Sequence, residues 1–142
     1  MLIGEYSHSI DDKGRVRIPK NLRDDLGETF YVTKGFDKCI FVFSEVEWKR
    51  FMTKVNQNYM KKKDFRRIQR FFTGSANEVS LDGQGRVTIS QALRDYGNFS
   101  KDVTVVGMND RVELWATDAW KAYMSEVEDI SDMADSLEDL DL

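Results

Sequence analysis

The feature that most constrains the fold is an internal repeat, because the chain contains the same short pattern twice. Residues 11–23 (DDKGRVRIPKNLR) and residues 82–94 (DGQGRVTISQALR) match at a constant offset of 71 residues. Both copies keep the acid, the glycine three positions later, the arginine after that glycine and the spacing of the apolar residues. The chain is therefore expected to fold as two related halves with pseudo-twofold symmetry.

Each copy predicts a tight turn followed by a short strand. Polar and apolar residues alternate over 15–18 and again over 86–89, which is the period of a half-buried strand. Gly14 and Gly85 suit the turn, because glycine adopts a positive φ without steric cost. The arginine that follows each glycine is expected at the start of the strand, facing outward.

The acid of each copy lies four residues before this arginine. Asp11 can therefore hold the guanidinium of Arg15, and Asp82 that of Arg86. An arginine held in this way suits a bidentate partner, such as a phosphate or the edge of a guanine. For a single D-x-x-x-R pattern, an exposed ion pair that contributes little stability is the simpler interpretation. The repetition inside a longer matched segment favours a binding role.

The rest of each half follows a common order of elements. The pattern predicts a first strand over 2–10, and then in each half a short helix, a hairpin with a glycine in its turn and an amphipathic helix. The short helices are expected at 20–26 and after Ser90, and the hairpin strands at 30–33, 39–43, 104–106 and 112–115. The apolar stripe of the last helix recurs at an offset of 72, pairing Trp48, Phe51, Met52 and Val55 with Trp120, Tyr123, Met124 and Val127.

These elements divide the chain into four segments. They are a first repeat at 5–47, a helical connector at 48–75, a second repeat at 76–119, and a C-terminal helix with an acidic tail at 120–142. Repeats of about 45 residues would each be only marginally stable alone, so we expect them to share a core with each other or with neighbouring chains. The connector contains a basic amphipathic helix with six cations between 61 and 70. Three roles stay open for its cations: a solvated face, contact with phosphates, or contact with the acidic tail of another chain.

The net charge of −4 conceals a strong asymmetry. Residues 126–142 hold eight acids and no lysine or arginine, so residues 1–125 carry −4 + 8 = +4. The single cysteine, Cys39, excludes an intrachain disulfide, and no stretch approaches the ~20 apolar residues of a membrane helix. His8 is the only histidine, and with no second ligand at metal spacing it is interpreted as a packed residue. A cytoplasmic protein without a cofactor is expected.

Several further segments match a known family. They are residues 1–15 (MLIGEYSHSIDDKGR), 70–72 (RFF), 75–76 (SA), 85–86 (GR) and 113–115 (ELW). Together with the paired D-x-x-x-R patterns, they resemble the MraZ family of bacterial transcriptional regulators over nearly all of residues 1–124. For the fold, the resemblance implies an α+β, mainly β, chain. Two AbrB-like swapped-hairpin units, of the kind found in AbrB and SpoVT, would form pseudo-twofold, duplicated double-psi barrel units with flanking short helices.

The resemblance also implies a function. Family members bind short direct repeats in the promoter of the division and cell-wall gene cluster that encodes them, usually as repressors, and assemble into ring-like homo-oligomers. Carried over by position, the expected DNA-binding residues are Arg15 and Arg86, supported by Lys13 and Arg17. The residues expected to brace the two turns are Asp11, Gly14, Asp82 and Gly85.

The second copy departs from the family pattern at three positions. Where the first copy has Lys13, Arg17 and Pro19, the second has Gln84, Thr88 and Ser90. The first copy is therefore expected to contribute more positive charge to a DNA contact.

The expected partners are double-stranded DNA and other copies of the chain, with no membrane and no small-molecule substrate. The protein would then be associated with the nucleoid. A rival interpretation is an antitoxin-like protein-interaction module that also binds DNA and whose acidic tail occupies a basic partner. An enzyme is a weaker alternative, because the carboxylates of Asp11, Asp12 and Asp82 lie in turns beside cations, without a nucleophile or metal cluster. No catalytic residue or metal ligand is assigned.

Overall fold

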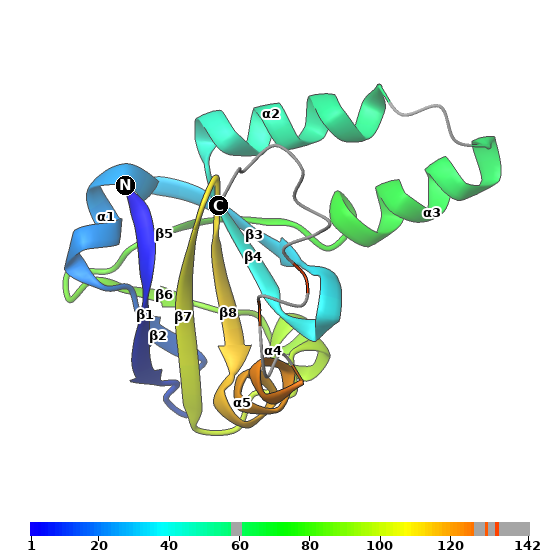
Figure 1. Cartoon of the computed structure of the whole chain (residues 1–142). Helices are drawn as coiled ribbons and strands as arrows, with labels where there is room; N and C mark the ends of the chain where they lie inside the picture. Colours follow the sequence, from blue (N-terminus) through cyan, green and yellow to red (C-terminus); the bar gives the residue numbers. More distant parts are fainter. Residues whose placement is uncertain (58–60, 127–129, 131–132, 134–142) are drawn as a thin grey trace.

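The computed structural model describes residues 1–57, 61–126, 130 and 133. Within these residues the chain is α+β and consists mainly of strands, with short helices around them (Figure 1). The strands are β1 (Leu2–Ser9), β2 (Arg15–Arg17), β3 (Thr29–Lys34), β4 (Ile40–Ser44), β5 (Asn77–Ser80), β6 (Arg86–Thr88), β7 (Asp102–Asn109) and β8 (Val112–Ala116). The helices are α1 (Lys20–Leu26), α2 (Glu45–Asn56), α3 (Lys62–Phe72), α4 (Gln91–Tyr96) and α5 (Thr117–Ser125), with a 3-10 turn at Phe36–Lys38.

Residues at the helix ends explain where several helices begin and stop. Pro19 precedes α1, and Gly27 ends it with a φ of 82°. Ser90 caps α4, because its side chain accepts a hydrogen bond from the backbone of Leu93, and Ser44 caps α2 in the same way. The short helices expected at 20–26 and after Ser90 are thus confirmed as α1 and α4.

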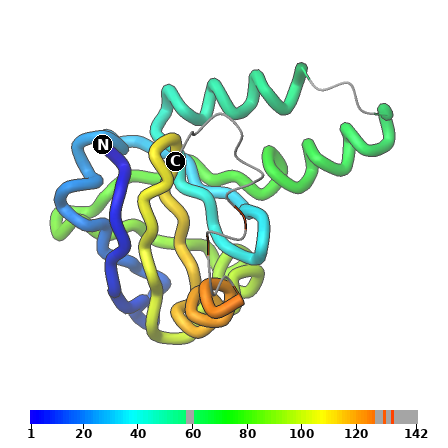
Figure 2. Tube along the Cα trace, in the orientation of Figure 1, coloured from blue at the N-terminus to red at the C-terminus, as the bar shows by residue number. Residues whose placement is uncertain are grey.

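The strands form a six-stranded antiparallel sheet and a separate two-stranded ribbon. The order in the large sheet is β1-β7-β8-β4-β3-β5, and the ribbon pairs β2 with β6. The first strand of each half pairs with the hairpin of the other half: β1 with β7, and β5 with β3. Figure 2 shows β1, in blue, beside β7, in yellow. Because of this exchange, neither half completes its own sheet.

Two strand pairs mark the pseudo-twofold axis. In the ribbon, Val16 pairs with Val87, its own equivalent 71 residues later. In the large sheet, Phe41 pairs with Glu113, its own equivalent at an offset of 72. The axis therefore passes through the ribbon and between β4 and β8, the two central strands of the sheet.

The hairpins depart from the single offset of 72 that the sequence pattern predicted. Phe30 and Val32 of β3 face the core as Val103 and Val105 of β7 do, so these strands match at 73. The difference arises in the loops. The connection before β3 consists of residues 27–28, whereas residues 97–101 precede β7. The longer turn at 35–39, compared with 108–111, then restores the offset to 72 in β4 and β8.

One hydrophobic core draws on both halves, which confirms the expectation of a shared core. The side chains of the ribbon, the inner face of the large sheet, α1 and α4 meet in a single cluster. Its completely buried members include Val16, Ile18, Leu22, Val87, Ile89 and Leu93. Burying an aliphatic side chain of this size stabilises a fold by about 1.5–3 kcal/mol, so this cluster holds the ribbon in place.

A second cluster covers the other face of the sheet. Because strand side chains alternate between faces, Phe41 and Phe43 point away from the core that Ile40 and Val42 enter. Helices α2, α3 and α5 pack their aromatic residues against this face. The ribbon and these three helices therefore lie on opposite sides of the large sheet.

Candidate nucleic-acid interface

The first turn is organised by one carboxylate. Asp11 Oδ1 accepts hydrogen bonds from the backbone N–H of Lys13 at 3.0 Å and of Arg15 at 2.9 Å. Asp11 Oδ2 accepts a hydrogen bond from Arg15 Nε at 2.6 Å, and the N–H of Gly14 donates to the Asp11 carbonyl at 3.0 Å. The same side chain thus fixes both the backbone of the turn and the guanidinium of its arginine.

The second turn has the same set of bonds. Asp82 Oδ1 accepts from the backbone N–H of Gln84 and of Arg86, both at 2.9 Å, and Oδ2 accepts from Arg86 Nε at 2.8 Å. The N–H of Gly85 donates to the Asp82 carbonyl at 3.1 Å. The repeat in the sequence is therefore a repeat of local geometry, down to individual atoms.

Both turns require glycine. Gly14 has a φ of 81° and Gly85 a φ of 75°, in the left-handed region that costs other residues energy. A Cβ on Gly14 would lie 2.7 Å from the carbonyl oxygen of Ile89, whereas a Cβ on Gly85 would meet the guanidinium of Arg23. A side chain on Gly14 would therefore collide with backbone, and one on Gly85 would have to displace the end of the Arg23 side chain.

Backbone hydrogen bonds join the two turns to each other. The N–H of Ile18 donates to the Gly85 carbonyl at 3.0 Å, and the N–H of Ile89 donates to the Gly14 carbonyl at 2.7 Å. Each strand of the ribbon therefore leads into a bond with the opposite turn. The structure places Arg15 and Arg86 on one two-stranded ribbon.

The register sets the neighbours of each arginine. Arg15 pairs with Thr88, and Arg17 pairs with Arg86. Arg86 Nη1 also lies 3.9 Å from Asp11 Oδ2, so the first carboxylate is close to both arginines. The side chains of Arg15 and Arg86 are 31% and 23% exposed, and those of Lys13 and Arg17 are exposed at the surface.

The charge states of the site follow from these hydrogen bonds. The backbone N–H of Arg15 is the first cause that lowers the pKa of Asp11, and the backbone N–H of Arg86 does the same for Asp82. Both carboxylates are therefore ionised at neutral pH. Burial lowers the pKa of His8, and the charges of Arg17 and Arg23 lower it further, so this histidine is neutral beside the cationic ribbon.

Sequence reasoning missed one pair of supporting arginines. Arg23 Nε donates to the Ile18 carbonyl at 2.7 Å, and Arg94 Nε donates to the Ile89 carbonyl at 3.0 Å. Each arginine projects from a short helix and ties the end of its own strand, while its guanidinium lies against the glycine of the opposite turn. The sequence could have indicated a role for this pair, because the repeat keeps both arginines at the offset of 71.

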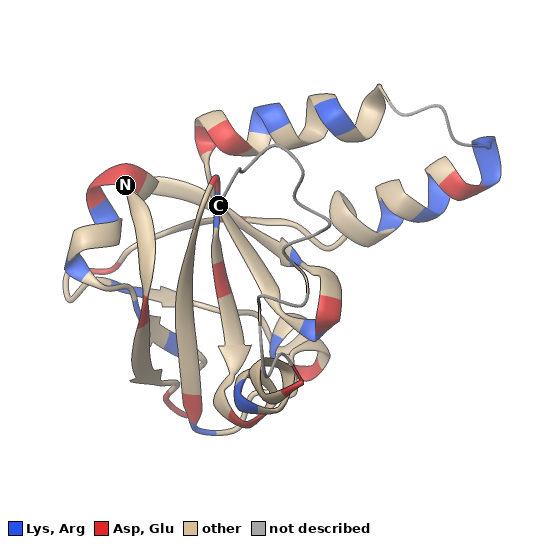
Figure 3. Cartoon of the chain, in the orientation of Figure 1, with Lys and Arg blue, Asp and Glu red and all other residues tan. Residues whose placement is uncertain are grey.

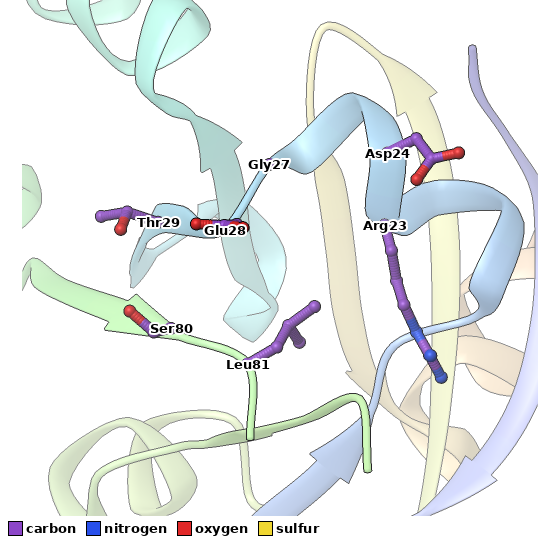
Figure 4. Close-up of a pocket in the computed structure, with 7 residues that line it drawn as sticks. All are labelled: Arg23, Asp24, Gly27, Glu28, Thr29, Ser80 and Leu81. Atoms are coloured by element: carbon purple, nitrogen blue, oxygen red, sulfur yellow. The ribbon is translucent and has the colours of Figure 1, made fainter. Parts of the chain in front are cut away.

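The two halves differ in the space beneath the short helices. A cavity of about 570 Å³ beside α1 is lined by residues of α1, the following connection and the end of β5 (Figure 4). In the second half, Phe99 of the longer connection packs against the core, and the Lys101 carbonyl accepts a hydrogen bond from the N–H of Ile10. The cavity is thus explained by the short connection at 27–28, which provides no equivalent of Phe99.

The described part of the chain offers little for other chemistry. No group of three or more His, Cys, Asp or Glu side chains within it could hold a metal ion. Cys39 is buried, and burial raises the pKa of its thiol well above the ordinary value, so the thiol stays protonated. In the same residues, every helix is too short or too polar to span a bilayer.

Comparison with known proteins gives a consistent result over the whole chain. The model of a family described as "MraZ protein, putative antitoxin-like" matches twice, over residues 1–71 and 72–142. The division between the two matches falls at the offset of the internal repeat. A protein of Thermoanaerobacter sp. (strain X514), named "Transcriptional regulator MraZ", is 42% identical over 143 residues, which cover all of this chain and all of that protein.

Proposed function

Because the chain belongs to the MraZ family, we propose that it is a transcriptional regulator that binds double-stranded DNA through the β2–β6 ribbon. The observation that carries this proposal is the pair of equally built turns, joined by hydrogen bonds on one ribbon, each with one arginine. The name of the Thermoanaerobacter relative supports the regulatory role. The strand exchange between the halves supports an AbrB-like swapped-hairpin barrel as the fold type.

The bracing contacts leave each arginine able to bind a partner. Within Arg15, only Nε and the backbone N–H donate to Asp11, and the two Nη groups of this arginine make no hydrogen bond to any residue that the structure describes. Nη groups can bind guanine O6 and N7, or two phosphate oxygens, in a bidentate manner. Lys13 and Arg17 would add charged contacts to phosphates, with Arg17 directly across the ribbon from Arg86, whereas Gln84 and Thr88 could offer only neutral hydrogen bonds.

A single pair of turns is too weak to select one promoter. A bidentate arginine discriminates between bases by about 1–3 kcal/mol. We therefore propose that several copies, assembled as a ring-like homo-oligomer, place successive ribbons on direct repeats, which multiplies the weak contact through effective concentration.

On this proposal the target is the promoter of the protein's own division and cell-wall gene cluster, the effect is repression, and the site of action is the nucleoid in the cytoplasm.

The test compares Arg15→Ala and Arg15→Lys with the wild-type protein. Binding is measured by mobility shift on the DNA upstream of the protein's own gene and on a scrambled fragment of equal length. Lysine keeps the charge but lacks the planar fork, so Arg15→Lys should lose most of the preference for the upstream DNA while retaining non-specific affinity. Arg15→Ala should lose both. Unchanged affinity and preference in both variants would remove Arg15 from the mechanism.

The family description also mentions antitoxins, which favours one alternative function. On this alternative the chain neutralises a basic partner protein through its acidic residues 126–142 and binds DNA in addition. Co-purification of such a partner, abolished when the acids of this segment are replaced by their amides, would support it. A regulator that acts through DNA alone should purify without the partner and keep its DNA affinity in the amide variant.

A further inference from the structure

The face of the sheet opposite the ribbon carries an apolar groove of about 280 Å³. It lies between α5 and the turn of the first hairpin. Four of its large apolar residues are at least 40% exposed, namely Phe36, Met108, Tyr123 and Met124. Apolar side chains gathered at this exposure on a water-soluble surface indicate that another apolar group covers them.

The polar groups at the base of this groove are already satisfied. Glu113 accepts hydrogen bonds from Arg111 Nη2 at 2.8 Å and from Trp115 Nε1 at 3.0 Å. Arg111 also donates to Asp110 at 2.9 Å and stacks over the ring of Phe41. The groove is therefore suited to apolar side chains rather than to a charged ligand.

The position of the groove identifies a segment that can reach it. Tyr123 and Met124 form one wall, and α5 ends one residue later at Ser125. Glu126 comes next and donates its N–H to the Tyr123 carbonyl, so the described chain reaches the rim of the groove. The 16 residues that follow, 127–142, can extend roughly 50 Å. The end of this segment offers three leucines as apolar anchors, namely Leu137, Leu140 and Leu142.

Charge complementarity points to the same segment. Residues 127–142 hold seven acids and no lysine or arginine. Helix α3 borders the groove, because Phe71 stacks on Phe36 with ring centroids 6.4 Å apart. This helix and the residue before it expose six cations, visible along α3 in Figure 3, and their one ion pair within the described residues joins Arg67 to Asp64 at 4.0 Å.

We propose that residues 127–142 dock on their own chain. The leucines of this segment occupy the groove between α5 and the first hairpin, and its acids lie along the basic face of α3. The segment then covers the exposed aromatic residues and neutralises the cations of α3. This inference is independent of DNA binding, because the ribbon lies on the opposite side of the sheet.

Disulfide trapping in the full-length chain tests the proposal. In a Cys39→Ala background, Met108→Cys in the groove wall is combined with Leu140→Cys in the C-terminal segment. The matched control combines Leu140→Cys with Val46→Cys, an exposed apolar position on α2 outside the groove. Docking raises the effective concentration of the two thiols, so the groove pair should form an intrachain disulfide about tenfold faster than the control pair. Electrophoresis without reductant and mass measurement distinguish monomeric from dimeric products.

Equal rates for the two pairs would overturn the proposal, and so would a mainly dimeric product, which would show that the segment docks on a second copy. A further measurement does not depend on the cysteine variants. Replacing the three leucines by serine in the otherwise wild-type chain should expose the groove, increasing the binding of an apolar dye and shifting the emission of Trp115 and Trp120 to longer wavelength. No change in either signal would also contradict docking.

Discussion

Asp11 and Asp82 each combine two roles that are often separate. Each carboxylate closes a tight turn through two backbone N–H groups and orients one guanidinium through Nε. A surface ion pair alone would contribute little to stability. Here the same carboxylate also replaces water on backbone donors, so removing its charge affects the turn as well as the arginine.

The first prediction concerns pH. The folded pKa of Asp11 and Asp82 lies below the value in the unfolded chain, so the ionised form stabilises the fold. This contribution is complete above the ordinary aspartate pKa of about 4 and is lost as pH falls through the lowered folded value. Asp82→Asn should be less stable than the wild type at pH 7 and should lose less stability in acid.

Urea unfolding between pH 2.5 and 7 measures this difference. Asp12→Asn is the matched control, because Asp12 lies in the equivalent first turn, next to Asp11, and is exposed. The control should follow the wild-type curve across the pH range. If Asp82→Asn also followed that curve in parallel, the hydrogen bonds of this carboxylate would not be a source of stability.

The second prediction concerns the glycines, which can be ranked by geometry. Gly83 has neither a positive φ nor a neighbour within 4 Å of a new Cβ, Gly27 has a positive φ only, and Gly14 has both a positive φ and a backbone clash. Placing a residue with a Cβ in the left-handed region costs about 1–2 kcal/mol. Substitution by alanine should therefore leave the free energy of unfolding unchanged or slightly raised at Gly83, lower it at Gly27, and lower it most at Gly14. A Gly14→Ala variant as stable as Gly27→Ala would show that the clash at Ile89 is relieved.

Single elements show which parts of the structure follow from local sequence. The turns, α1, α4 and the cap of α2 could be predicted, because glycine, proline, serine and the apolar period act within a few residues. The pairing of β1 with β7 could not, since Leu2 and Asn109 are more than a hundred residues apart. Nor could the cavity beside α1, which depends on a difference in loop length that only the strand register reveals.

The third prediction belongs to the central strands. Phe41 of β4 pairs with Glu113 of β8, and the two residues occupy equivalent positions in the two halves. The second half therefore has a glutamate where the first half has an aromatic ring. The Glu113 side chain is 8% exposed, and Arg111 is its charged partner. Breaking a buried pair leaves one charge uncompensated and costs about 3 kcal/mol, whereas replacing both members by apolar residues of similar size is often neutral.

Arg111→Met alone should therefore destabilise the protein strongly. The double variant Arg111→Met with Glu113→Leu should regain the part of this loss that comes from the uncompensated charge, but not all of the stability, because the buried Trp115 Nε1 then lacks its acceptor. The free energy of unfolding in urea provides the comparison. Additive decreases in the double variant would mean that the two residues stabilise the fold independently of each other.

At the scale of the whole molecule, the large sheet separates two surfaces with different chemistry. One side carries the ribbon with its paired arginines. The other side carries the apolar groove between α5 and the first hairpin, and the basic helix α3. The net charge of −4 describes neither surface, because eight acids lie in residues 126–142. The sequence could place arginines at the start of two strands. Only the exchange of strands between the halves brings these strands together as one ribbon.

The central claim is that this ribbon is the surface that binds DNA. The most direct test is the affinity for the upstream DNA fragment of two double variants that remove the same charge. Arg15→Ala with Arg86→Ala changes the ribbon, whereas Lys49→Ala with Arg50→Ala changes exposed cations on α2, on the other side of the sheet. The measurement is fluorescence anisotropy over a series of salt concentrations.

The ribbon variant should bind more weakly, and the slope of its affinity against salt concentration, both on logarithmic scales, should be shallower by about 0.9 for each phosphate that it no longer neutralises. The α2 variant should bind like the wild type at every salt concentration. Equal reductions in the affinity of the two variants would mean that only overall charge matters, and wild-type binding by the ribbon variant would place the DNA-binding surface elsewhere.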